Sequence, residues 1–64
     1  MSAPAPHPRD AWIDEFINEL IHLRPDLSPQ FVVAVAQSEW PRRQQIDPRA
    51  AACEWNGRVK SARP

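Results

Sequence analysis

The sequence predicts an all-α fold, a compact three-helix bundle, from the positions of its prolines and the spacing of its apolar residues. Four prolines divide residues 9–60 into three segments with helical patterning: Pro25, Pro29, Pro41 and Pro48. Two of them follow an oxygen-bearing side chain, Ser28 in one case and Asp47 in the other, as expected of an N-cap followed by proline at the first helical position. We therefore expect one domain over residues 9–59, with helices at about 10–24, 28–40 and 47–57.

The first segment has the periodicity of an amphipathic helix. Its apolar residues recur at intervals of three and four, with polar residues between them. The apolar positions are Trp12, Ile13, Phe16, Ile17, Leu20, Ile21 and Leu23. Asp14 near the start and Arg24 near the end have the signs that the helix dipole favours. Pro25 then ends the helix.

The second segment begins at Ser28, where Leu27 can pack against Val32 as a hydrophobic staple. Residues 31–36 are apolar on every side, so a helix there must be covered on more than one face. A strand is the alternative interpretation, because valine-rich runs suit a pleated sheet. No other segment alternates in the way that a partner strand requires, which favours a helix ending at Pro41.

The third segment repeats the start signal, since Ile46 precedes the Asp47 cap and can pack on Ala51. Trp55 follows Ala51 by four residues, on the same side of a helix. Asn56-Gly57 is typical of a C-cap, because both residues tolerate the left-handed conformation. This places the end of the third helix near residue 57 and leaves Val59 beyond it.

The expected core draws on all three helices. It consists of Ile13, Phe16, Ile17, Leu20, Phe31, Val32, Val35, Ala36, Ala51 and Trp55. Cys53 lies among alanines on the expected core side, where a free cysteine behaves as a small hydrophobic residue. Outside the domain, residues 1–8 are rich in proline and alanine and predict a disordered arm, and residues 60–64 predict a flexible basic tail.

Length and composition argue against an enzyme. A chain of 64 residues forms at most one domain and leaves little interior for a pocket, so we expect no small-molecule substrate. The lone Cys53 cannot form an intrachain disulfide, and His7 and His22 show no metal-ligand spacing relative to it. A Cys53–His22 nucleophilic pair is disfavoured by the apolar surroundings of the cysteine. We predict no catalytic, cofactor-binding or metal site.

The sequence also carries expectations about location and origin. No positively charged start followed by an apolar run marks a secretory signal, and the longest apolar run has six residues, against about 20 for a membrane span. We therefore expect a cytoplasmic protein. Its cations are seven arginines and one lysine, and alanine and proline are abundant, which is typical of GC-rich bacterial genomes.

Charge is distributed unequally along the chain. Residues 1–40 hold six acidic residues and two arginines, a formal charge of −4, whereas residues 41–64 carry +4. The simplest interpretation is a set of solvated faces with weak intramolecular attraction. Antiparallel self-association would match the two halves across a two-fold axis, and a basic second half could instead meet an acidic partner or nucleic acid.

Three helices with a basic second half suggest a helix-turn-helix DNA-binding regulator as the alternative function. The residues that would contact nucleic acid are Arg42, Arg43, Arg49 and Arg58. The expected connection over residues 41–47 is longer than the three or four residues of that motif. A net charge of zero also removes the long-range attraction on which DNA affinity depends.

The leading hypothesis is a small non-enzymatic protein–protein interaction module, a homodimer or an assembly subunit. The apolar stripe of the first helix is wider than two short neighbours require, with Trp12 and Ile21 at its margins, and Val33 lies on the far side of the second helix. Trp40 and Trp55 each precede an arginine by three residues, and such tryptophans either anchor helix ends or form docking surfaces. We predict Trp12, Ile21, Val33 and Trp40 as partner-binding residues.

Overall fold

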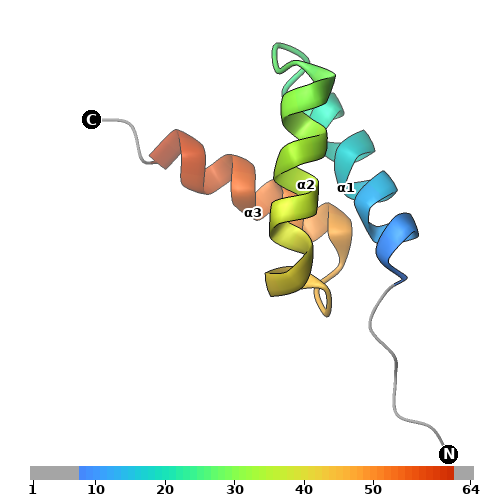
Figure 1. Cartoon of the computed structure of the whole chain (residues 1–64). Coiled ribbons are helices and arrows are strands. Elements are labelled where there is room, and N and C mark those ends of the chain that lie inside the picture. The colour runs from blue at the N-terminus through green and yellow to red at the C-terminus, as the bar shows by residue number, and fades with distance from the viewer. Residues whose placement is uncertain (1–7, 62–64) are drawn as a thin grey trace, which may run out of the picture.

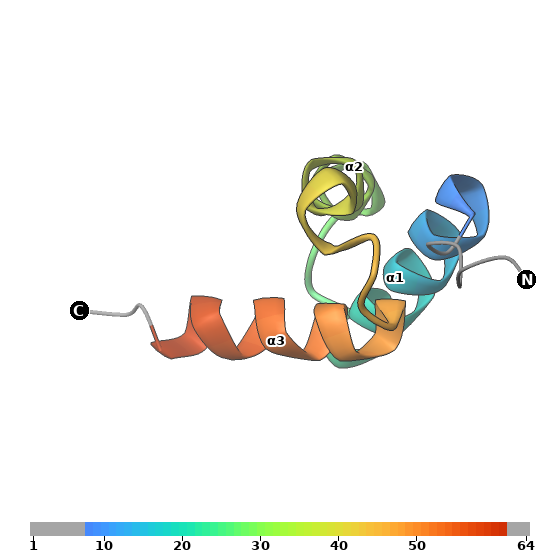
Figure 2. The ribbon, with the colours of Figure 1, turned by 90° about the horizontal axis from the view of Figure 1, so that it is seen from below.

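The computed structural model describes residues 8–61, and over this range the chain forms three α-helices and no strand. The helices are α1 (Arg9–Leu23), α2 (Pro29–Arg43) and α3 (Pro48–Ser61). The helix α1 packs against both of the others, while α2 and α3 make little contact with each other. The second half of α3 extends beyond α1 and α2 (Figures 1 and 2). The predicted all-α fold is confirmed.

Both predicted helix starts are confirmed by their capping hydrogen bonds. The hydroxyl of Ser28 accepts a hydrogen bond from the backbone N–H of Phe31 at 3.2 Å. One carboxylate oxygen of Asp47 accepts from the N–H groups of Arg49 and Ala50, at 3.1 Å each. A proline follows each cap, where the first turn of a helix needs no backbone donor. The starts of α2 and α3 are therefore encoded locally.

The two connections between helices have the same pattern of backbone hydrogen bonds and apolar contacts. In the first, the N–H of Leu27 donates to the carbonyl of Arg24 at 3.2 Å, and in the second the N–H of Ile46 donates to the carbonyl of Arg43 at 2.9 Å. In each case the sequence then continues with a capping residue and a proline. Leu27 and Ile46 both pack against the hydrophobic core, so each chain reversal is anchored by one apolar side chain.

Arg24 ties the first connection to the third helix. Its guanidinium donates two hydrogen bonds to the carboxylate of Asp26, at 3.0 Å each, and a third to the side-chain oxygen of Asn56 at 3.3 Å. The hydrogen bonds from Arg24 lower the pKa of the Asp26 carboxyl. The end of α1 therefore lies close to the middle of α3.

The core is smaller than the sequence predicts, and one tryptophan dominates it. Its fully buried residues are Trp12, Phe16, Leu20, Val32, Ala36, Ala51 and Ala52. A second group packs against them while partly exposed: Ile13, Ile17, Leu27, Val35, Trp40, Ile46 and Trp55. The alanines on α3 carry small side chains, which lets α1 and α3 approach each other closely.

Trp12 connects all parts of this core. Its ring stacks on Phe16 with a centroid separation of 5.1 Å and meets the ring of Trp40 edge-on at 5.6 Å. Its indole N–H donates to the carbonyl of Ile46, in the second connection, at 2.8 Å. Only 1% of Trp12 is exposed, so its expected place at the margin of the apolar stripe, where a partner would reach it, is wrong. Trp40 of α2 and the second connection cover the flank on which it lies.

Two further expectations about burial are wrong. Phe31 was expected in the core but is 47% exposed, because α2 and α3 make little contact; its ring packs against that of Trp55 with a centroid separation of 6.1 Å. Cys53 is exposed, whereas its neighbour Ala52 is buried. Each residue of a helix is rotated by about 100° from the last, which is enough to move a side chain from the core to the surface.

The helix α2 does not end at Pro41 but continues to Arg43. Proline in a helix removes one backbone hydrogen bond and disfavours the helical conformation of the residue before it. Contacts on both sides offset this cost, because Trp40 packs on Trp12 and Arg43 forms ion pairs with two glutamates. The side-chain amide of Gln44 also donates to the carbonyl of Pro41 at 3.4 Å.

The helix α3 likewise runs through the expected C-cap to Ser61. Gly57 does not adopt a positive φ, so it forms part of the helix, at an intrinsic cost of about 1 kcal/mol relative to alanine. Asn56 is held by Arg24, and Arg58 forms an ion pair with Glu39. Val59 is therefore helical, as are residues 60 and 61 of the expected tail. Residues 1–7 of the expected arm and 62–64 of the tail lie outside the described residues.

Replacing Trp12 with alanine should remove the element that joins the helices. Trp12→Ala is expected to cost about 3–5 kcal/mol, a large part of the stability of a domain of this size. Urea unfolding followed by far-ultraviolet circular dichroism measures the loss. The matched control is Gln37→Ala at an exposed position of α2, which should cost less than about 1 kcal/mol. Equal unfolding midpoints for Trp12→Ala and the unmodified chain would contradict this role.

Candidate interaction surfaces

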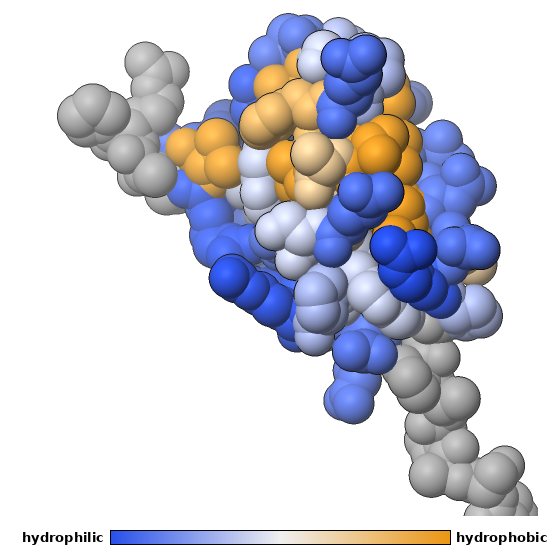
Figure 3. All heavy atoms as spheres, viewed as in Figure 1, coloured by the Kyte–Doolittle hydropathy of each residue, from blue (hydrophilic) through white to orange (hydrophobic). Residues whose placement is uncertain are grey.

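Four large apolar side chains are exposed in the described part of the chain. They are Ile21 (37%), Phe31 (47%), Val33 (37%) and Val59 (39%). Figure 3 shows apolar residues gathered over α2 and its two flanks, and again near the C-terminal end of α3. The four residues therefore divide into two surfaces, one on each side of α2.

The first surface, the α1–α2 edge, consists of Ile21, Val33 and the half-buried Trp40. Trp40 faces α1, since it meets Trp12 there, and Val33 precedes it by seven residues on the same side of α2. Ile21 lies about 200° around α1 from Glu19, which faces α3, so Ile21 is on the side away from α3. Three of the four predicted partner-binding residues are therefore at least partly exposed, whereas Trp12 is buried.

The second surface, the α2–α3 face, consists of Phe31, Trp55 and Val59. Phe31 and Trp55 pack against each other with their rings tilted by 60°. Val59 follows Trp55 by four residues and extends the same side of α3 into the part that projects beyond the other helices. Sequence reasoning missed this surface, although the spacing of Trp55 and Val59 was its signal.

A cluster of charges joins α2 to α3 beside this face. Glu39 is 7% exposed, and its carboxylate pairs with Arg58 at 3.2 Å and with Arg43 at 3.7 Å. Arg43 also pairs with Glu54 of α3. No buried side-chain nitrogen or oxygen in the described residues lacks a hydrogen-bond partner. The cluster therefore has a structural role, holding together two helices whose backbones are far apart.

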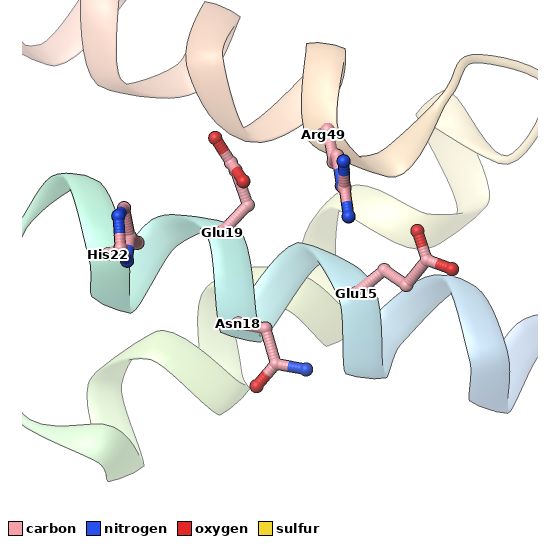
Figure 4. Close-up of a pocket in the computed structure, with 5 residues that line it drawn as sticks. All are labelled: Glu15, Asn18, Glu19, His22 and Arg49. Atoms are coloured by element: carbon pink, nitrogen blue, oxygen red, sulfur yellow. The ribbon is translucent and has the colours of Figure 1, made fainter.

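This cluster occupies two of the four arginines predicted to contact nucleic acid, Arg43 and Arg58. A third, Arg49, extends from α3 toward the carboxylates of α1 (Figure 4). Arg42 is exposed and forms no ion pair with any residue that the structure describes. The arrangement does not gather the four cations into one free basic patch.

One observation favours the helix-turn-helix alternative. Because α2 continues to Arg43, the connection to α3 has four residues, 44–47, and the predicted length of seven is wrong. Four residues match the turn of that motif. The helix after it, α3, presents Arg58 and Lys60 on its projecting part.

The pocket in Figure 4 is open and polar. Glu15, Asn18, Glu19 and His22 of α1 line it together with Arg49 of α3. The four α1 residues follow the i, i+3, i+4, i+7 spacing of one helix face. The pocket is therefore the solvated acidic face of α1 at the point where α3 crosses it, with Arg49 offsetting part of the negative charge.

Glu39 should contribute to stability through its two arginines. Glu39→Gln keeps the size of the side chain but removes its charge, and we expect a loss of about 1–2 kcal/mol in the free energy of unfolding. The matched control is Glu15→Gln, an exposed residue without an ion pair among the described residues. Chemical denaturation compares the two variants, and an equal effect of both would argue against the cluster.

Within residues 8–61, no group of three or more potential metal ligands is close enough to hold an ion. None of the helices described here has the length and apolar character needed to cross a membrane. Comparisons with protein-family models, curated proteins and solved structures found no match.

Proposed function

We propose that this chain is a small non-enzymatic protein–protein interaction module that binds through the α1–α2 edge, as a homodimer or as a subunit of an assembly. The proposal rests on the exposure of Ile21 and Val33, at 37% each, and on the partial exposure of Trp40, which shares the side of α2 that holds Val33. Exposed apolar groups gathered in this way favour association, because a partner removes them from water.

The small core gives a physical reason for association. Three of its seven fully buried residues are alanines, which bury little apolar surface. Domains of this size are marginally stable unless metal ions, disulfides or a partner chain supplement the core. Full burial of one exposed valine or isoleucine contributes about 1.5–3 kcal/mol, and Ile21 and Val33 are each still 37% exposed, so a partner that covers them adds roughly 0.5–1 kcal/mol for each.

The absence of an enzymatic role is part of the proposal. Glu39 is the buried charged residue of the described part, and two arginines engage it, which supports a structural use of its carboxylate. The acidic residues of α1 lie on a solvated helix face. The cytoplasmic location and bacterial source expected from the sequence stay predictions.

The alternative proposal is a small DNA-binding regulator that uses α2, the four-residue connection and α3. The length of the connection favours it. The ion pairs of Arg43 and Arg58 and the position of Arg49 opposite two carboxylates weigh against it. Phosphate contacts by Arg43 or Arg58 would first have to break their ion pairs, which reduces the affinity gained.

A charge placed on the α1–α2 edge should prevent association. Val33→Asp puts a carboxylate at a site that becomes apolar in the complex, and we expect association weaker by at least about tenfold. Sedimentation equilibrium over a wide range of protein concentration, under reducing conditions, measures it. The matched control is Ala34→Asp, at the exposed neighbouring position on another side of α2.

The proposal is wrong if Val33→Asp and Ala34→Asp associate as the unmodified chain does. Far-ultraviolet circular dichroism must show both variants folded for the comparison to count. An unmodified chain that stays monomeric at every concentration would contradict the homodimer and leave an assembly with a different subunit as the only form of the proposal.

The DNA-binding alternative predicts a different response. Fluorescence anisotropy with a generic DNA duplex should then show binding that weakens steeply with salt and that falls on replacing Arg42 and Arg49 with alanine. The leading proposal predicts no such binding. A steep salt dependence lost in the arginine variants would favour the regulator.

A further inference from the structure

The α1–α2 edge has an acidic border. Asp14, Ile17 and Ile21 follow one another at intervals of three and four, so they share one side of α1. Asp14 is exposed and forms no ion pair with any of the described residues. Asp10 precedes Asp14 by four residues on the same side of α1 and pairs with Arg9 at 3.7 Å, whereas Glu15 and Glu19 face the pocket. Any partner of this edge therefore meets apolar side chains next to negative charge.

The α2–α3 face has a basic border. Phe31 and Arg42 are eleven residues apart, close to three full turns, so they lie on the same side of α2. Arg42 has no ion pair among the residues that the structure describes, and Arg58, beside Val59 in sequence, is half-exposed. Arg42, Arg43 and Arg58 outnumber the two glutamates beside this face, Glu39 and Glu54, which leaves a local formal charge of +1.

The two surfaces are therefore complementary in charge and alike in apolar character. Contact between two α1–α2 edges would bring acidic borders together, and contact between two α2–α3 faces would bring basic borders together, and both are disfavoured. Contact of the edge of one copy with the face of another brings opposite charges together around an apolar centre. The projecting half of α3 leaves Val59 accessible to such a neighbour (Figure 2).

We propose that the partner of this module is a second copy of the same chain, and that the α1–α2 edge of each copy packs on the α2–α3 face of the other. The arrangement is reciprocal about a two-fold axis, which closes the dimer and covers both surfaces at once. Asp14 of each copy then lies near Arg42 of the other. The inference rests on the proposed interaction function and specifies its partner and its second surface.

Charge reversal tests this pairing. Asp14→Arg and Arg42→Glu are each expected to weaken the dimer by at least about tenfold, because each creates two like-charge contacts, one at each half of the symmetric interface. An equimolar mixture of the two variants should recover the affinity of the unmodified chain to within about threefold, since opposite charges meet in both halves of that dimer. Sedimentation equilibrium at low salt measures all three.

Two controls match the size of each charge change. Glu15→Arg changes the charge of α1 by the same amount as Asp14→Arg, but on the side of α1 that faces the pocket. Lys60→Glu matches the charge change of Arg42→Glu, but it lies on a different side of α3 from Trp55 and Val59. Neither should change the dimer affinity by more than about threefold. Phe31→Ser tests the apolar centre without a charge and should weaken the dimer if the α2–α3 face is in contact.

The pairing is overturned if Asp14→Arg and Arg42→Glu associate as tightly as the unmodified chain, if the controls weaken association equally, or if the mixture fails to recover. A dimer that Val33→Asp disrupts but that Arg42→Glu and Phe31→Ser leave intact would keep the α1–α2 edge and reject the α2–α3 face. A chain that remains monomeric under all conditions would reject the second copy itself. These results separate failure of the pairing from failure of the interaction function.

Discussion

The fold depends on the position of Trp12. This side chain stacks on Phe16 within α1, meets Trp40 of α2 and donates its indole hydrogen bond to the carbonyl of Ile46, just before α3 begins. A 64-residue chain has few large side chains to bury, so one tryptophan that contacts two helices and the connection to the third replaces a larger core. The same contacts make Trp12 inaccessible to any partner and direct association to other residues.

The weak contact between α2 and α3 has two consequences. It leaves Phe31 and Val59 exposed, which creates the α2–α3 face, and it requires long side chains to hold the two helices in place. Glu39 of α2 meets this requirement by pairing with Arg43 of the same helix and with Arg58 of α3. Those arginines are then engaged within the molecule, which lowers their availability to nucleic acid. A single packing feature therefore accounts for the apolar surface and for the use of the basic residues.

The sequence predicted those features that depend on neighbouring residues. The caps at Ser28 and Asp47 are local, and the structure has both. The ends at Pro41 and Gly57 were predicted wrongly, because their local cost is offset by ion pairs between residues far apart in sequence. The spacing of apolar residues placed Trp12 at the margin of one apolar stripe and Phe31 in the core. Whether each side chain is covered in the folded chain depends on how the helices cross, which residue spacing does not determine. For the candidate site, Ile21 and Val33 were predictable as excess apolar residues. The α2–α3 face was missed because Asn56-Gly57 predicted a helix end before Val59, although Trp55 and Val59 share one side of α3.

Hydrogen exchange of the three indole N–H groups, measured by nuclear magnetic resonance on the intact chain, tests the role of Trp12 most directly. The indole of Trp12 is buried and donates to Ile46, whereas Trp40 and Trp55 are partly exposed and donate to no residue that the structure describes. Exchange at Trp12 should therefore require global unfolding and be much slower than at the other two. Equal exchange rates at all three indoles would contradict a fold organised around Trp12.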